Sequence, residues 1–263
     1  MSDAVKGTVY LVGAGPGAPD LLTLRAARLL ATADVVLHDD LVPDDVVAMC
    51  SRHALVTSVG KRCGRPRITQ AGIHDLMVDS ARRGLSVVRL KSGDPLVFGR
   101  AAEELAALRE ARIPLEVVPG VSAVFAAGAA LQLPLTDRKN ASKLILITGQ
   151  HAKDKTVPIW QGALPDDATL AVYMPGRDMV ALAAELMQAG VATDMPCVAV
   201  SRAATAHQQA TAARLAAFGA VVVGAAPVLV LVGRAMESML VQDTEAVAPD
   251  VFTELIERVA LQR

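Results

Sequence analysis

The first residues that could do chemistry lie in a glycine-rich segment near the N-terminus. Residues 13–18 have the sequence GAGPGA and directly follow the β-rich run 8–12. Glycines after a strand allow a tight turn and let backbone N–H groups approach a ligand, and the spacing matches the GxGxxG/A pattern of dinucleotide sites. Pro16 removes one N–H from this loop, and the Pro-Asp pair at 19–20 delays the next helix. A dinucleotide site, a loop for another ligand and a plain turn all stay open.

A second polar segment, residues 91–95 (KSGDP), follows the apolar run 85–90. Loops at the carboxyl ends of strands form the ligand crevice of open α/β sheets. Backbone groups and the Asp94 carboxylate could hold a polar, cationic small molecule there. The alternative is an Asx-type turn before proline.

A third segment, residues 60–67 (GKRCGRPR), carries four basic side chains and no acidic one. Arginine offers planar, bidentate contacts to carboxylates and phosphates. The segment therefore predicts an anion-binding loop, with a solvated basic loop as the alternative. Its basic residues are Lys61, Arg62, Arg65 and Arg67.

Arg100 and Glu103 lie three residues apart where a helix is expected to begin, so their side chains can share one face. They could line a site, although a glutamate at a helix N-terminus often only compensates the helix dipole. The five histidines are scattered without ligand spacing, and no metal site is predicted. They are His38, His53, His74, His151 and His207.

Composition narrows the class of protein. The 263 residues are 52% hydrophobic and 20% charged, which excludes an extended disordered chain. Aromatic residues make up 3% and the net charge is −1, which argues against single-strand stacking and against a basic nucleic-acid binder. Residues 60–143 nevertheless carry a net charge of +6, which favours an anionic ligand there.

The chain shows no signal of secretion or membrane insertion. Three distant cysteines form no CxxC pair, so a disulfide scaffold is not expected. The N-terminus has no apolar signal segment, and the most apolar stretch, 221–232, is too short to span a bilayer. A cytoplasmic protein without a membrane or nucleic-acid partner is predicted.

Strand and helix patterns alternate along the chain, which predicts α/β layers with at least partly parallel sheets. Strands are expected at 8–12, 34–37, 85–90, 115–118, 143–148, 169–174, 197–201 and 228–232. Helices are expected at 20–33, 69–83, 101–112, 121–131 and 179–188, of which 121–131 is apolar or small nearly all round and is expected to be buried. The polar stretch 137–142 predicts a boundary between an N-terminal domain (1–138) and a C-terminal domain (139–241), followed by a tail (242–263).

Taken together and in this order, the motifs resemble the tetrapyrrole methylase family. The resemblance extends from about Val9 to about Arg234. Four stretches carry it: VYLVGAGPGAPDLLTLRAARLL (9–30), GKR (60–62), VVRLKSGDPLVFGR (87–100) and IPLEVVPGVSA (113–123).

The resemblance implies two α/β domains with a cofactor and substrate cleft between them, and a homodimer. The implied cofactor is S-adenosyl-L-methionine (SAM), which leaves as S-adenosyl-L-homocysteine (SAH). Carried over position by position, the cofactor-binding residues are Pro16, Ser92, Gly93, Asp94, Val97, Ser122, Ala123, Met174 and Ala203.

The resemblance also implies roles on the substrate side. Asp39 matches a proton acceptor and Lys61 a proton donor, while Arg100 and Glu103 match a pair that lines the substrate side of the cleft. The implied reaction is two C-methylations of uroporphyrinogen III, a tetrapyrrole with several carboxylates, to precorrin-2. Arg62, Arg65 and Arg67 would then bind substrate carboxylates.

Other functions stay open beside this one. They are methylation of a later precorrin or cobalt-precorrin, an NAD-dependent oxidoreductase that uses residues 13–18, and a binding protein that has lost catalysis. The chain departs from the family pattern mainly on the substrate side, at His38 and Asp40 and at Asp137 and Lys139. It also departs at Pro175, which follows the predicted cofactor residue Met174. SAM binding is therefore a firmer expectation than the substrate.

Overall fold

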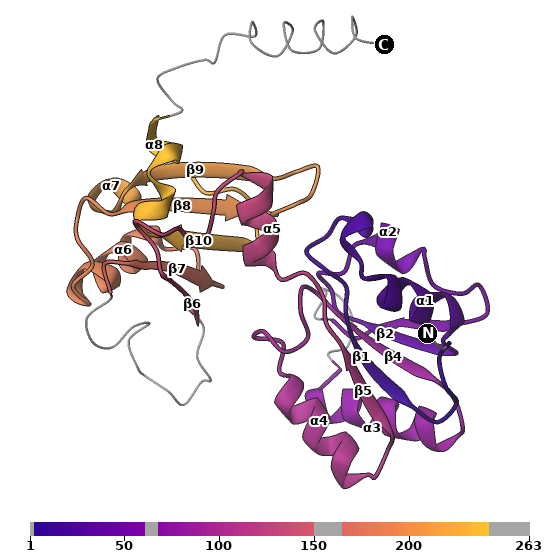
Figure 1. Ribbon diagram of the computed structural model, residues 1–263. Coiled ribbons are helices and arrows are strands. Elements are labelled where there is room, and N and C mark those ends of the chain that lie inside the picture. The colour runs from indigo at the N-terminus through magenta and orange to yellow at the C-terminus, as the bar shows by residue number, and fades with distance from the viewer. Residues whose placement is uncertain (1–2, 61–67, 150–164, 242–263) are drawn as a thin grey trace, which may run out of the picture.

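The computed structural model describes residues 3–60, 68–149 and 165–241. Within them the chain forms two five-stranded sheets, each covered by helices (Figure 1). The α/β prediction is confirmed, and the alternation of strands and helices holds through most of both sheets. No helix among these residues is long and apolar enough to cross a membrane.

The first sheet is entirely parallel. Its strands are β1 (Val9–Gly13), β2 (Val35–His38), β3 (Leu55–Ser58), β4 (Val87–Lys91) and β5 (Leu115–Val118), in the order β3-β2-β4-β1-β5. The strands β1, β2 and β4 are buried along their whole length, as expected for parallel strands covered on both faces.

Helices cover both faces of this sheet (Figure 1). The helix α1 (Leu24–Thr32) packs on the face of Val88 and Leu90, after the short 3₁₀ turn η1 (Pro19–Leu21). The helices α3 (Gln70–Arg82) and α4 (Ala101–Glu110) pack on the face of Val87. A short helix, α2 (Asp44–Val47), lies between β2 and β3.

Parallel pairing brings the carboxyl ends of all five strands to one edge of the sheet. The loops that follow β1, β2, β4 and β5 therefore emerge side by side, with β1 hydrogen-bonded between β4 and β5. Such an edge, where the strand order reverses, is the usual place for a ligand in open α/β sheets.

The second sheet is mixed. Its strands are β6 (Lys143–Thr148), β7 (Ala168–Tyr173), β8 (Pro196–Ser201), β9 (Gln209–Arg214) and β10 (Val228–Val232), in the order β6-β7-β10-β8-β9. Only the β6–β7 pair is parallel. The helices α6 (Met179–Gln188) and α7 (Leu215–Phe218) cover one face.

The other face of the second sheet is covered by α5 (Ala123–Ala130), with the 3₁₀ turn η2 (Arg234–Met236) and α8 (Ser238–Val241) next to it (Figure 1). Val124 and Ala127 of α5 belong to the same buried cluster as Val198 and Leu229 of that sheet. The predicted burial of residues 121–131 is confirmed for Val124 and Ala127, while Phe125 is exposed. We therefore propose that the chain divides into two units at residues 119–122 rather than at 138/139. The first unit is built on the sheet of β1 to β5 and the second on the sheet of β6 to β10.

Two strands of the structure were not predicted from the sequence patterns. Both β3 and β9 are edge strands with exposed or half-buried side chains, so they lack the continuous apolar run that marks their neighbours. The helix expected at 20–33 begins only at Leu24, because Thr23 caps it by accepting the N–H of Ala26 at 3.1 Å.

The carboxylate of Asp34 ties β2 to β4 at their amino ends. It accepts the N–H and the hydroxyl of Ser86 at 2.8 and 2.6 Å, and the Lys6 ammonium at 2.6 Å. Lys6 first, and then Ser86, lower the pKa of Asp34 from 3.8 to about 2. Because the folded state holds the ionised form, this contribution to stability is present above pH 3.8 and is lost as the pH falls toward 2.

Asp34→Asn should therefore lower the free energy of unfolding at about pH 7, and the deficit should shrink at about pH 3. Urea denaturation at both pH values measures the difference. The exposed Asp75→Asn on α3 serves as the control and should show little effect at either pH. A deficit in Asp34→Asn that does not change with pH would contradict the assignment.

Candidate active site

The loops after β1 and β4 are joined directly through their backbones. Gly15 and Gly93 form an isolated bridge, in which the Gly93 N–H donates to the Gly15 carbonyl at 2.7 Å and the Gly15 N–H to the Gly93 carbonyl at 3.2 Å. Both glycines have positive φ, +70° and +67°, a conformation that favours glycine. The backbone N–H and carbonyl of Gly15 in the glycine loop are therefore hydrogen-bonded to the loop after β4.

Asp94 ties the β4 loop to the segment after β5. One carboxylate oxygen accepts the N–H of Gly120 at 3.1 Å and the other accepts the N–H of Leu96 at 2.8 Å. The approach is so close that a Cβ on Gly13 would lie 2.6 Å from backbone atoms of Gly120 and Gly93. Both oxygens of Asp94 therefore hold the loops in place.

The second unit contributes loops with unusual backbone conformations. Met174 follows β7 with φ +48°, and Arg202 and Ala204 follow β8 with φ +49° and +56°. Non-glycine residues in this region carry strain and cluster at ligand clamps and active sites. The loop after β8 also reaches the first unit, because a Cβ on Gly17 would lie 2.8 Å from the methyl group of Thr205.

Tyr173, at the end of β7, links the two units. Its hydroxyl shares a 2.7 Å hydrogen bond with the Ser122 hydroxyl and accepts the N–H of Val124 at 3.1 Å, both at the start of α5. Its ring lies 5.1 Å from the ring of Phe98 in the β4 loop, at an interplanar angle of 53°. The segments that follow β4 and β5 are thus both placed against the second sheet.

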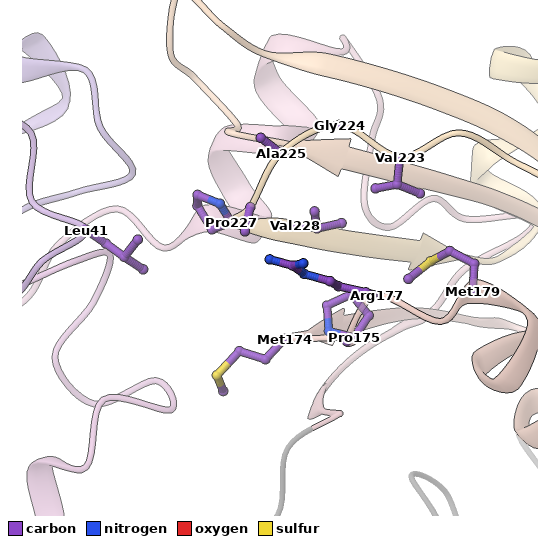
Figure 2. Close-up of a pocket in the computed structure, with 12 residues that line it drawn as sticks. Leu41, Met174, Pro175, Arg177, Met179, Val223, Gly224, Ala225, Pro227 and Val228 are labelled. Carbon is purple, nitrogen blue, oxygen red and sulfur yellow. The ribbon is translucent and has the colours of Figure 1, made fainter. Parts of the chain in front are cut away.

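A cavity of about 650 Å³ opens between the loop after β2, the segment after β7 and the segment that leads into β10 (Figure 2). Figure 2 shows Leu41, from the loop after β2, facing the second unit across it, and the Arg177 guanidinium extending into it. Apart from Arg177, the side chains that line it are apolar. They come from Leu41, from residues 174–176 and 179, and from residues 223–228.

A second cavity of about 500 Å³ lies over the carboxyl ends of β2 and β4. Its polar lining includes Asp39, Arg89, Lys91, Ser92 and Arg100, together with Asp40, Thr69 and Gln70. Leu41 lines both cavities, so they are neighbours with a shared wall. Their volumes lie in the range typical of small-molecule sites.

Beneath the second cavity lies a network of buried charges. Glu104 of α4, 0% exposed, accepts the Arg89 Nε at 2.9 Å on one oxygen and the Lys91 ammonium at 2.8 Å on the other. The Arg89 Nη2 donates to the carboxylate of Asp39. Burial, and then the charge of Arg89, lower the pKa of Lys91, while Glu104 and Asp39 oppose them.

The family follows from comparison with known proteins. The model of the tetrapyrrole (corrin/porphyrin) methylases matches residues 8–218, most of the chain. The chain belongs to this family. The resemblance stated from the motifs is confirmed.

Individual proteins of known name are also similar to this chain. The uroporphyrinogen-III C-methyltransferase of Paracoccus denitrificans is 43% identical over 234 residues, which are 88% of this chain and 82% of that protein. A chloroplastic protein of Arabidopsis thaliana, named S-adenosyl-L-methionine-dependent uroporphyrinogen III methyltransferase, is 41% identical over 240 residues, which are 89% of this chain and 65% of that protein. The chain spans about half the length of the siroheme synthases it matches.

A solved structure has the same fold. The uroporphyrin-III C-methyl transferase of Thermus thermophilus, complexed with S-adenyl homocysteine, is 38% identical to this chain. The match covers 88% of this chain and 99% of that one, with a TM-score of 0.74.

The structure brings most of the predicted cofactor residues to one region of the protein. Ser92, Gly93, Asp94 and Val97 lie in the loop after β4, Pro16 adjoins the Gly15–Gly93 bridge, Ser122 and Ala123 begin α5, and Met174 lines the larger cavity. Ala203, 8% exposed, packs instead in the core beneath α5. Of this set, Asp94 and Ser122 have their side-chain oxygens engaged within the protein.

The predicted substrate-side residues are brought together only in part. Asp39 and Arg100 line the smaller cavity. Glu103 is not among its lining residues, but its carboxylate binds Arg100 at 2.6 and 2.9 Å, and this contact lowers the pKa of Glu103. Lys61, Arg62, Arg65 and Arg67 lie outside the described residues.

Sequence reasoning missed Arg89, Lys91 and Glu104. The signal was present in β4, because Arg89 and Lys91 alternate with apolar residues on one face of a strand otherwise suited to burial. Two buried cations need an acidic partner, and the first turn of α4 supplies Glu104. Among the described residues no group of three or more His, Cys, Asp or Glu side chains is arranged to hold a metal ion.

Adjacent residues of α4 give a direct test of the buried network. Glu104→Ala should lower the free energy of unfolding by about 3–5 kcal/mol, because it leaves two buried cations without their carboxylate. Glu103→Ala removes an exposed ion pair and should cost about 1 kcal/mol or less. Urea denaturation of both variants measures the contrast, and equal losses would contradict the network.

Proposed function

We propose that this methylase is a SAM-dependent C-methyltransferase that converts uroporphyrinogen III to precorrin-2 by two methylations. The named activities of the relatives from Paracoccus and Arabidopsis support the substrate, and the S-adenyl homocysteine complex of the Thermus protein supports the cofactor. The observation in this chain that carries the proposal is a pair of adjoining cavities, one mostly apolar and one lined by charges.

The loops around the larger cavity suit SAM. Its apolar walls can take up an adenosine. The β4 loop, whose Ser92 lines the adjoining smaller cavity, would contribute to the site from that side. The Asp94 carboxylate supports that loop by accepting two backbone N–H groups, those of Leu96 and Gly120. SAM would supply a sulfonium methyl group for transfer to a nucleophilic pyrrole carbon.

Positioning is the main task left to the protein in such a transfer. The contact between Phe98 and Tyr173 holds the β4 loop against the second unit, which fixes the position of one cavity relative to the other. The apolar side chain of Leu41 lines both cavities where they adjoin. No charge need be stabilised at the sulfonium, because its charge disappears during the transfer.

The smaller cavity suits the macrocycle and its carboxylates. Arg100, whose side chain is 55% exposed, lies at its rim and can bind a carboxylate. We propose that Asp39 accepts the proton released as the π-system rearranges and that Lys61 donates one. General acid–base groups typically accelerate such steps about 10²–10⁴-fold. We propose substrate-carboxylate contacts for Arg62, Arg65 and Arg67 as well.

The dinucleotide alternative fits the geometry poorly. The Gly15 N–H donates to the Gly93 carbonyl, so it is not free for a pyrophosphate. The first full helix begins at Leu24, six residues beyond Ala18, so its N-terminus does not directly follow the glycines as in dinucleotide-binding folds.

Anaerobic incubation of the protein with SAM and uroporphyrinogen III, followed by mass spectrometry, tests the function. We expect a product that has gained two methyl groups. A product with no added methyl group, from protein that still binds SAH, would overturn the substrate. The assay would then turn to later precorrins, and NAD binding without SAH binding would favour an oxidoreductase.

The role of Asp94 gives a separate prediction for cofactor affinity. Asp94→Asn keeps one acceptor oxygen and replaces the other with a donor, so the N–H of Gly120 or Leu96 loses its partner. The loss of such a bond should weaken SAH binding about tenfold. Isothermal titration calorimetry measures this, with Asp75→Asn as the matched control. Unchanged affinity would remove Asp94 from the supports of the cofactor site.

The homodimer and the cytoplasmic location stay predictions. Light scattering on the purified chain tests the oligomeric state, for which a dimer is expected. A monomer at micromolar concentration would contradict it.

A further inference from the structure

The carboxylate of Glu104 is fully engaged. One oxygen accepts the Arg89 Nε at 2.9 Å and the Gln70 amide at 3.3 Å, and the other accepts the Lys91 ammonium at 2.8 Å. Glu104 is fully buried and does not line the smaller cavity, so it cannot touch a substrate there.

Arg89 carries the constraint from Glu104 to the cavity. Its Nη1 donates to the carbonyl oxygens of Leu37 and Leu90, both at 3.2 Å, its Nε donates to Glu104, and its Nη2 donates to Asp39. Each nitrogen of the guanidinium therefore has an acceptor in a different direction. This fixes the plane of the group, and with it the point at which Nη2 meets Asp39.

Asp39 is held on its other side by the backbone. Its N–H donates to the Leu90 carbonyl at 3.1 Å, and its carbonyl accepts the N–H of Val42 at 3.2 Å. Arg89 takes Oδ1, and the side chain of Asp39 remains 33% exposed at the cavity wall. The orientation of the carboxylate toward the cavity thus depends on Arg89.

We infer that Glu104 is a positioning residue for the methylation, acting through Arg89 to aim the Asp39 carboxylate at the substrate cavity. The inference rests on the proposed function and deepens it. Stability alone does not account for the network, because buried ion pairs are often no more stabilising than apolar residues of similar volume. This network instead ends at a carboxylate on the wall of a cavity.

The test is a double-mutant cycle between Glu104→Gln and Asp39→Asn. A glutamine at 104 has one acceptor oxygen, so its amide group must face either Arg89 or Lys91 as donor against donor. Glu104→Gln should lower kcat about tenfold or more, with KM and SAH affinity within about twofold of the wild type. In the Asp39→Asn background the same change should cost about twofold or less, because the group it aims has been removed.

The matched control is Glu110→Gln, the same chemical change at an exposed position of α4, which should leave kcat unchanged. A folded Glu104→Gln protein with wild-type kcat would overturn the inference, as would an equal loss with and without Asp39. A wild-type protein that adds no methyl group would instead contradict the proposed function. The two failures are therefore distinguishable.

Arg89→Lys serves where Glu104→Gln does not fold or Asp39→Asn has no measurable rate. It keeps the positive charge but removes the guanidinium that reaches Asp39, so kcat should fall with SAH affinity retained. Combined with Glu104→Gln in a folded protein, it should cost no more than the larger single loss. Wild-type kcat in Arg89→Lys, or fully multiplicative losses in the combination, would overturn the inference.

Discussion

The close approach of Gly13, Gly93 and Gly120 is the constraint on which the site depends. The carboxyl ends of β1, β4 and β5 converge so tightly there that a Cβ on Gly13 or Gly120 would collide with backbone. The contact brings the N–H of Gly120 within reach of the Asp94 carboxylate. It also fixes the direction in which the chain leaves the first sheet toward α5.

From that point the second unit is placed by a few contacts. Tyr173 binds Ser122 and the N–H of Val124 through its hydroxyl and contacts Phe98 with its ring. The segment that leaves the first sheet thus leads directly into α5, which packs on the second sheet through buried side chains. The larger cavity is lined from both units, by Leu41 from the first and by residues 174–177, 179 and 223–228 from the second.

The first sheet serves both stability and chemistry through β4. One face of this strand presents Val88 and Leu90 to α1 in an apolar core. The other presents Arg89 and Lys91 to Glu104, beneath the smaller cavity. Burying these charges is costly unless every partner is present. That cost is consistent with a role for the network at the substrate cavity.

Much of the fold could be predicted from the periodicity of apolar residues and from the residues that end each run. The bounds of β5, β6, β10 and α6 agree with the expected ranges residue for residue, because each is an apolar or amphipathic run with clear ends. The edge strands β3 and β9 could not, because half-exposed strands lack that pattern. The packing of α5 on the second sheet is a tertiary choice that a helix with apolar residues nearly all round does not reveal.

The candidate site was predicted mainly through its motifs. The resemblance implies cofactor contacts for Ser92 and Asp94 and substrate-side roles for Asp39 and Arg100. In the structure Asp39, Ser92 and Arg100 line one cavity, while both oxygens of Asp94 accept backbone N–H groups. The Arg89–Glu104 contact joins residues fifteen positions apart on a strand and a helix. Only the packing of α4 over β4 brings them together.

Hydrogen–deuterium exchange of the wild-type protein, with and without saturating SAH, tests the central claim that loops of both units form one cofactor site. We expect slower exchange in residues 92–97 of the first unit, in residues 121–125 where the two units join, and in residues 174–178 and 202–206 of the second unit. Exchange in α3, away from these loops, should stay the same. Protection confined to one unit, or absent from all four segments, would contradict the account.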